Sequence, residues 1–238
     1  MDNAFYSTLT RQSGLMHEMR VVANNIANVS TTGFRREGLI FAEHVAALGA
    51  GGPSLSMAHA DARSINQSQG PLSATGGSLD FAIEGEGFFQ IETPQGNRLT
   101  RAGNFTASAE GELVTTDGYR LLDAGGAPIL LPPDTGTIRL SQDGTLSSGD
   151  GPIAQVGVFR PADPTTLTHE SGTRLAFDTE LEQVENATLL QGFLEDSNVD
   201  AISEIARMIE VQRAYEMGQT FLDREDERIR STISTLTR

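Results

Sequence analysis

Both ends of this 238-residue chain carry an apolar repeat of helical period, and this feature limits its possible folds most. Steps of four and three residues connect a first row of mostly apolar side chains: Phe5, Leu9, Gln12, Met16, Met19, Ala23 and Ile26. The same steps connect a second row near the end: Ala201, Ile205, Met208, Gln212, Tyr215, Gln219, Leu222, Asp226, Ile229, Ile233 and Leu236. Because such rows match the a and d positions of a heptad, we predict helices over about 3–29 and 199–236.

An amphipathic helix of this kind does not bury its apolar row alone, so the two helices are expected to pair as an antiparallel, coiled-coil-like hairpin. The rows have polar breaks, and both have apolar neighbours on one flank, which favours packing against more than one helix. An intramolecular stalk remains the alternative. If the helices pack against other chains, the flanking residues that would face those chains are Ala4, Leu15, Val22, Ile202 and Ile209.

Capping signals support the helix boundaries. The first helix is expected to end in the cluster from Ser30 to Gly33, where the glycine suits a left-handed C-cap. Ser197, with Asp200 three residues later, matches a capping box at the start of the second helix.

The middle of the chain has a different period. Residues 49–79 are rich in Gly, Ser, Ala and Gln and predict an extended connection. Short β-rich runs separated by turn signals follow, which indicates a small all-β domain. The expected fold class is therefore α+β, with long terminal helices and a central all-β domain. The predicted divisions are a first helix in 1–36, an extended connector in 37–78, a β domain in 79–190 and a second helix in 191–238.

Composition excludes several classes of protein. Seventeen basic residues, all Arg, oppose 32 acidic ones, for a net charge of −15, which argues against binding to nucleic acid or to an acidic membrane surface. The absence of Cys and Lys removes disulfides, thiolate sites and Schiff-base chemistry. No apolar run is long enough to span a membrane, and the first 20 residues lack the apolar core of a signal peptide.

No motif predicts a cofactor, a metal ion or an enzyme. The run Asp196, Asn198, Asp200 resembles the start of an EF-hand loop, but Ala201 and Arg207 stand where Gly and Glu are required. A glycan-cleaving enzyme would need two acids with different pKa values. The pairs considered for that alternative are Glu84 with Glu112 and Asp143 with Asp150, and their Gly-rich surroundings favour a solvated surface instead.

Three segments, in order along the chain, resemble the bacterial flagellar axial proteins, the family of rod and hook subunits. Residues 23–34 match its N-terminal motif, 69–89 match the entry to its β domain, and 194–216 match its C-terminal helix. The motif residues of the first segment are Asn24, Asn25, Asn28, Gly33 and Phe34. The short distance between the first helix and the β domain is most similar to proximal-rod members, with a distal-rod member as the alternative.

The resemblance implies a structural subunit of the flagellar basal-body rod, built with other rod proteins around the export channel to transmit torque. It implies export through the flagellar type III apparatus without a cleaved signal, a periplasmic location in the rod, and no enzymatic activity, cofactor or membrane insertion. A soluble coiled-coil adaptor that never polymerises is the remaining alternative. The helix residues expected to contact other subunits are Phe5, Leu9, Met16, Met19, Ile26, Ile205, Met208, Tyr215, Leu222, Ile229 and Ile233.

Overall fold

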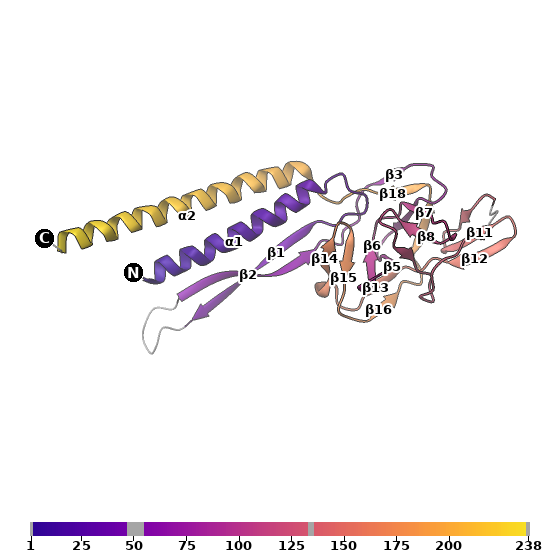
Figure 1. Cartoon of the computed structure of the whole chain (residues 1–238), viewed down its shortest axis with the longest axis horizontal. Coiled ribbons are helices and arrows are strands. Elements are labelled where there is room, and N and C mark those ends of the chain that lie inside the picture. Colours follow the sequence, from indigo (N-terminus) through magenta and orange to yellow (C-terminus); the bar gives the residue numbers. More distant parts are fainter. Residues whose placement is uncertain (1, 47–54, 133–135, 237–238) are drawn as a thin grey trace. The chain divides into compact units, whose positions relative to one another are not determined.

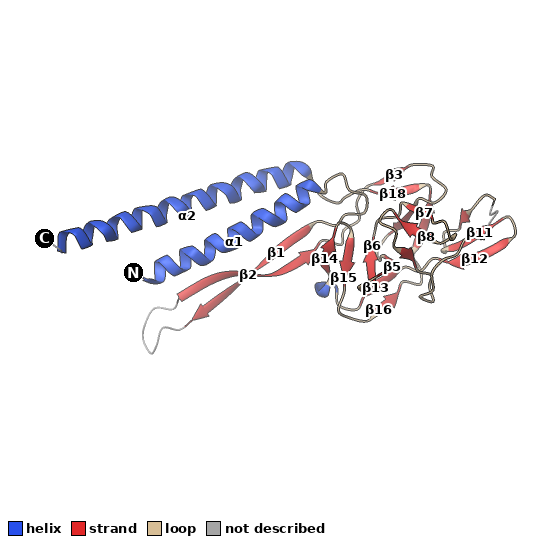
Figure 2. Ribbon diagram, viewed as in Figure 1, coloured by secondary structure: helices blue, strands red, loops and turns tan. Residues whose placement is uncertain are grey.

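The fold is α+β, with one long helix at each end of the chain and a β-rich region between them (Figures 1 and 2). A computed structural model describes residues 2–46, 55–132 and 136–236. The chain divides into two compact units, and each is considered separately. Unit 1 contains residues 1–27, 37–63 and 200–238, and unit 2 contains residues 28–36 and 64–199.

Unit 1 consists of two helices and a β-hairpin. Helix α1 spans Asp2–Ala27 and helix α2 spans Ala201–Leu236, close to the predicted bounds. The hairpin pairs β1 (Glu37–Ala46) with β2 (Leu55–Ile65), although the sequence predicted only an extended connector here. Residues 47–54 of that connector lie outside the described residues.

Helix α2 begins with an Asp cap. A carboxylate oxygen of Asp200 accepts hydrogen bonds from the backbone N–H groups of Ile202 (2.9 Å) and Ser203 (3.0 Å). Ser197 Oγ instead accepts from the Val199 N–H, so the predicted capping box is wrong. The reason is that one Asp side chain already satisfies two of the free N–H groups in the first turn.

Unit 2 is a set of short antiparallel strands. Its largest sheet has seven strands in the order β14-β15-β6-β5-β9-β8-β7, and the remaining strands form smaller sheets around it. The strands, with one 3₁₀ turn at Pro164–Thr166, are β3 (Leu72–Ala74), β4 (Phe81–Glu84), β5 (Phe89–Thr93), β6 (Gly96–Thr100), β7 (Phe105–Ala107), β8 (Leu113–Thr115), β9 (Arg120–Leu121), β10 (Arg139–Leu140), β11 (Thr145–Ser148), β12 (Gly151–Gln155), β13 (Phe159–Pro161), β14 (Thr168–Ser171), β15 (Arg174–Ala176), β16 (Leu181–Gln183), β17 (Thr188–Gln191) and β18 (Phe193–Glu195).

Two apolar clusters lie in unit 2. Phe89 belongs to a larger cluster with Ile91 and Leu113, while its neighbour Phe88 belongs to a smaller one with Leu99. Neighbouring residues of an extended chain point to opposite faces, so this one segment contributes an aromatic ring to each cluster. The sheet is therefore covered by apolar side chains on both faces.

The β-rich run from Ile153 to Phe159 is divided in the structure. Strand β12 ends at Gln155 and pairs with β11, whereas β13 starts at Phe159 and pairs with β16. Gly157 lies between them, and a methyl group there would lie 2.5 Å from the Phe159 ring. The chain changes partner where a glycine allows this close approach.

Candidate functional site

Helices α1 and α2 contact each other through buried polar side chains. Gln12 Nε2 donates to the Tyr215 carbonyl (2.8 Å), and Asn25 Nδ2 donates to Glu204 Oε2 (3.2 Å). Between them, Arg207 Nε donates to Glu18 Oε1 (2.6 Å). As the residue number falls along α1 it rises along α2, so the two helices run antiparallel.

Asn25 of the family motif joins three elements of unit 1. Its side-chain amide donates to the Glu37 carbonyl (2.8 Å) and accepts from the Glu37 N–H (2.9 Å), so it bonds the first residue of β1 as a neighbouring strand would. The same amide reaches Glu204 in α2. Asn25 and Glu204 are each 1% exposed.

The other asparagines of the motif lie closer to the surface. Asn28 Oδ1 accepts from Thr31 Oγ1 (3.1 Å), a local contact that stabilises the turn after α1. Asn24 is exposed on α1.

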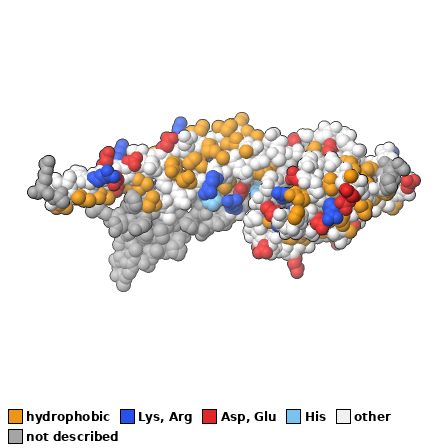
Figure 3. All heavy atoms as spheres, viewed as in Figure 1, with side chains coloured by type: hydrophobic (Ala, Val, Ile, Leu, Met, Phe, Trp, Pro, Cys, Tyr) orange, Lys and Arg blue, Asp and Glu red, His pale blue; other side chains and the backbone are white. Residues whose placement is uncertain are grey.

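Many apolar side chains of unit 1 point away from the helix contact. On the face visible in Figure 3, hydrophobic side chains gather along the helices. Large apolar side chains of the two helices that are more than 40% exposed are Leu9, Met16, Ile202, Ile205, Ile209, Met217, Phe221, Ile229, Ile233 and Leu236. So large an exposed apolar area on paired helices is typical of a protein interaction surface.

The predicted contact residues therefore fall into two groups. Met208, Tyr215 and Leu222 are half-buried on α2, and Met19 and Ile26 are half-buried on α1. The exposed members of the predicted set are Leu9, Met16, Ile205, Ile229 and Ile233.

Helix α1 is rotated relative to the predicted seam. Val22, which was expected to face other chains, is 4% exposed, whereas Leu9 and Met16 of the seam are 42% and 51% exposed. The physical reason is that Asn25 must be placed against Glu37 and Glu204, which turns the Leu9–Met16 face outward. The side chains of Ala4 and Phe5 lie outside the described residues.

Helix α2 continues beyond the beginning of α1 (Figure 1). Beyond Leu222 this helix carries Ile229, Ile233 and Leu236, at helical spacing. These three side chains are 46%, 56% and 81% exposed.

A buried ionic network lies in unit 2. Glu195 binds Arg35 (2.8 Å) through one carboxylate oxygen and Arg101 (3.0 Å) through the other. All three side chains are 1% exposed, and the Gly70 N–H also donates to Glu195. Burial lowers the pKa of Arg101 to about 10, against the opposing charge of Glu195, so the Arg101 guanidinium group keeps its charge near neutral pH.

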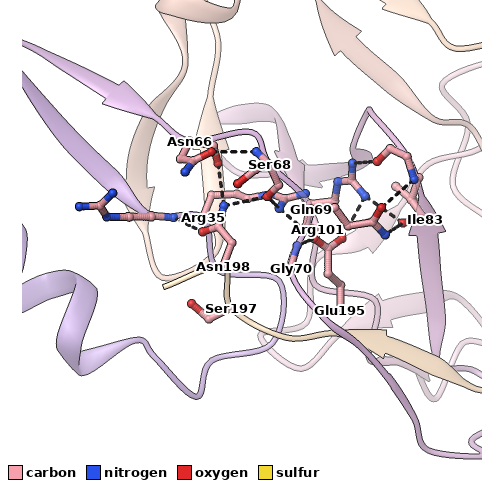
Figure 4. A network of polar contacts seen from close by, with 12 residues as sticks. Arg35, Asn66, Ser68, Gln69, Gly70, Ile83, Arg101, Glu195, Ser197 and Asn198 are labelled. Carbon is pink, nitrogen blue, oxygen red and sulfur yellow. Dashed lines mark hydrogen bonds and ion pairs between the residues drawn. The ribbon is translucent and has the colours of Figure 1, made fainter. Parts of the chain in front are cut away.

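The network connects the three segments that carry the family resemblance (Figure 4). Arg35 follows the first motif, Gln69 and Gly70 open the second, and Glu195 and Asn198 belong to the third. Gln69 binds the Ile83 carbonyl and the Gly85 N–H, and the Asn198 amide donates to the Ser68 carbonyl. These polar contacts fix segments that are far apart in the sequence.

Gly33 and Phe34 are part of the same region. Gly33 has a φ of +70° and donates its N–H to the Glu195 carbonyl, and a methyl group on it would lie 2.2 Å from the Ala102 nitrogen. Phe34 is 1% exposed and stacks on His169, whose Nε2 donates to the Arg35 carbonyl (2.8 Å). Gly33 therefore needs both the left-handed backbone and the missing side chain.

The acid pairs considered for an enzyme do not gain support. Hydrogen bonds from the backbone and hydroxyl of Thr145 hold the pKa of Asp143 below its ordinary value, whereas a general acid needs a raised pKa. Glu112 binds Arg120 (3.3 Å) on the surface. Among the described residues there is no cluster of three side chains suited to a metal ion, and neither described helix could span a membrane.

Three family models match the chain in sequence order. They are described as flagella basal body rod protein (residues 6–35), flagellar hook protein FlgE/F/G D1 domain (residues 82–148) and flagellar basal body rod FlgEFG protein C-terminal (residues 190–235). The first and third fall mainly on α1 and α2, and the second falls on the β strands of unit 2.

Similar proteins cover nearly the whole chain. Flagellar basal-body rod protein FlgF of Caulobacter vibrioides is 40% identical, over 99% of this chain and 98% of that protein. FlgF of Mesorhizobium japonicum is 37% identical, over 91% of this chain and 90% of that protein. Flagellar basal-body rod protein FlgG of Bacillus subtilis is 31% identical, over 98% of this chain and 99% of that protein.

Proposed function

The chain belongs to the flagellar basal-body rod protein family, and from this premise we propose that it is a structural subunit of the proximal rod, assembled helically with other rod proteins around the export channel to transmit torque. The similarity to proteins named FlgF, at 34–40% identity, supports the proximal position. Proteins named FlgG are 29–32% identical, so a distal-rod subunit is the alternative.

One observation carries this proposal: the helices bury polar contacts between themselves and expose apolar side chains. Gln12, Glu18 and Asn25 are buried, while Leu9 and Met16 on the same helix are exposed. A free two-helix stalk would be expected to bury its apolar residues and expose its polar ones. The many exposed apolar side chains suit subunits that cover each other's apolar faces in a helical tube, where one surface meets a different surface on the next copy.

The proposed roles follow the expected divisions. The helices in 1–36 and 191–238 form a coiled-coil-like inner-tube domain, residues 37–78 connect it, and residues 79–190 form the outer β domain. The proposed subunit contacts include Phe5, Leu9, Met16, Ile205, Ile229 and Ile233, together with the half-buried Met19, Ile26, Met208, Tyr215 and Leu222.

The proposed location is the periplasmic rod, reached through the flagellar type III export apparatus, and the proposed role needs no enzymatic activity or cofactor. A lack of Cys fits a chain that is unfolded for export, since no disulfide can form on the way. Residues 38–194 contain seven Arg and nineteen acidic residues. This negative charge keeps a β domain on the outside of the rod soluble.

The assembly surface is tested by one exposed substitution. Ile205 is 50% exposed, so Ile205→Asp is expected to leave the purified subunit folded, because no buried apolar contact is lost. In cells it is expected to abolish swimming, because a carboxylate would be buried against the next subunit. Glu210→Asp, on the same helix, conserves the charge and is the control. Normal swimming of the Ile205→Asp strain would contradict the proposed surface.

The position in the rod is tested by removing the gene and imaging isolated basal bodies. A proximal subunit predicts particles whose rod is missing or stops before the distal rod and hook. Particles with a complete proximal rod and no distal rod would instead assign the distal position. A complete rod with a hook would contradict both positions.

A further inference from the structure

The chain leaves and enters unit 2 at four points, which follow residues 27, 36, 63 and 199. The residues of unit 2 next to these points lie in three segments, 28–36, 64–70 and 195–199, and hydrogen bonds join the three segments to one another (Figure 4). We call the contacts among these segments and Arg101 the polar node. All of its residues belong to unit 2.

Backbone and amide groups hold the three segments side by side. The Gly33 N–H donates to the Glu195 carbonyl (2.7 Å), and the Asn66 N–H donates to the Arg36 carbonyl (2.9 Å). The side chain of Asn198 contacts the other two segments at once. It accepts from the Arg36 N–H (2.6 Å) and donates to the carbonyls of Asn66 (3.0 Å) and Ser68 (2.8 Å). The residues that lead to all four connections are therefore bound to one another.

Buried charges attach the polar node to the β strands. Arg35, from the first segment, and Arg101, which follows β6, both bind Glu195 of the third segment. Arg35 also donates to the Ser68 carbonyl, in the second segment. Arg101 donates to the carbonyl of Ile83 in β4 (3.1 Å). Through Glu195, the node is therefore held on the buried side of the β domain.

The chemistry of the polar node favours a positioning role. Apolar side chains of similar volume often stabilise a fold as well as a buried ion pair does, but ion pairs and hydrogen bonds hold their partners at fixed distances and directions. Given the proposed role in the rod, we propose that the polar node is the mechanical joint of the subunit. It holds the four connections as one piece, so that torque reaches the β domain through all of them together. Without the node, load acts on single connections in turn.

Two substitutions of different kinds weaken the polar node. Arg35→Gln removes one ion pair and leaves Glu195 with Arg101, so the remaining buried charges balance. Asn198→Ala removes the amide that contacts the other two segments and leaves every ion pair in place.

Two matched controls change the same residue types elsewhere in unit 2. Arg98→Gln removes a more exposed ion pair with Glu170 (2.7 Å), and Asn186→Ala truncates an exposed side chain. All four variants are tested as the full chain in cells, where the rod carries load.

All four variants are expected to build the normal number of flagella and to swim normally in dilute medium. The difference should appear under high load, in cells tethered to glass by one filament so that the motor turns the cell body. Under that load the two node variants should stop rotating at least about tenfold sooner than the two controls, because the contacts that they lose are each worth about this factor.

Equal rotation times for the node variants and the controls would overturn the proposal. Loss of flagella without load in both node variants would also overturn it, because the node would then serve assembly and not the transfer of load. If Arg35→Gln alone lacks flagella, the comparison of Asn198→Ala with Asn186→Ala decides. A complete rod in the strain without the gene would contradict the proposed function, a result that is separate from all of these.

Discussion

Glu195 is the residue on which the polar interior of unit 2 depends. It forms ion pairs with two guanidinium groups that are as buried as it is, from Arg35 and Arg101, and it also accepts a hydrogen bond from the Gly70 N–H. Together these three buried side chains carry one net positive charge. Removing this carboxylate, which contacts both guanidinium groups directly, should therefore be costly.

Glu195→Gln keeps the shape of the side chain and removes its charge. We expect the free energy of unfolding of unit 2 to fall by about 3–5 kcal/mol, the usual cost of breaking a buried ion pair on one side. Hydrogen exchange at the β5 and β8 amides in the full chain measures it. Glu170→Gln, which removes a more exposed pair with Arg98, is the control and should cost about 1 kcal/mol or less. A similar loss of unfolding free energy in both variants would show that the buried network contributes no more to stability than a surface ion pair does.

At the scale of elements, the start of α2 depends on a single cap. Hydrogen bonds from the N–H groups of Ser203 and Ile202 hold the pKa of Asp200 below its ordinary value. A lowered folded-state pKa means that the cap stabilises the helix above the ordinary Asp pKa and loses this effect as the pH falls through the lower, folded-state value. Acidification should therefore loosen the first turn of α2.

Asp200→Ala should remove this pH dependence along with the cap. The amides of Ile202 and Ser203 should exchange faster in the variant at neutral pH, because they lose their acceptor. Amide exchange followed from neutral pH to below the ordinary Asp pKa, with corrections from an unstructured peptide, provides the measurement. Asp223→Ala, an exposed position within the same helix, is the matched control. The same acid response in both variants would contradict the capping role.

Local patterns predicted the elements better than their contacts. The bounds of both helices differ from the predicted ones by no more than two residues, because heptad spacing and end signals are local. The hairpin of β1 and β2 was missed, since its Gly, Ala, Ser and His residues show no clear alternation and strand preference depends on the partner strand. The core strands β4, β5 and β8 have apolar runs that are visible in the sequence.

The polar interactions could not be predicted for a different reason. Arg101 and Glu195 are 94 residues apart, and nothing in their local sequences distinguishes them from surface charges. The family motif did identify Asn25, but its partner Glu204 stands in a separate segment, 179 residues later. The rotation of α1 follows from that pairing, so the heptad row alone gave the wrong inward face.

At the scale of the whole molecule, the two units differ in what holds them together. Unit 2 buries two apolar clusters around its sheets, whereas the helices of unit 1 bury Val21, Val22 and Val211 beside their polar contacts and leave many apolar side chains exposed. Burial of apolar area is the main source of folding stability, so the units should open with different free energies. A subunit that gains most of its helix packing on assembly has this distribution of stability.

Hydrogen exchange of the dilute full chain should reveal that difference directly. The slowest amides are expected in β4, β5 and β8, and the fastest helical ones in the last turns of α2, from Ile229 to Leu236, where exposed apolar residues lack a covering helix. At a concentration where the subunits assemble, protection of these turns should rise, because neighbouring subunits bury the apolar side chains, while β5 should change little. Two results together would indicate the non-polymerising adaptor instead. The helix amides would already exchange slowly in the monomer, and their protection would be the same at both concentrations. Ile233→Asp is the internal control: it should leave the monomer pattern unchanged and cancel the gain on assembly, since the added carboxylate favours water over the next subunit.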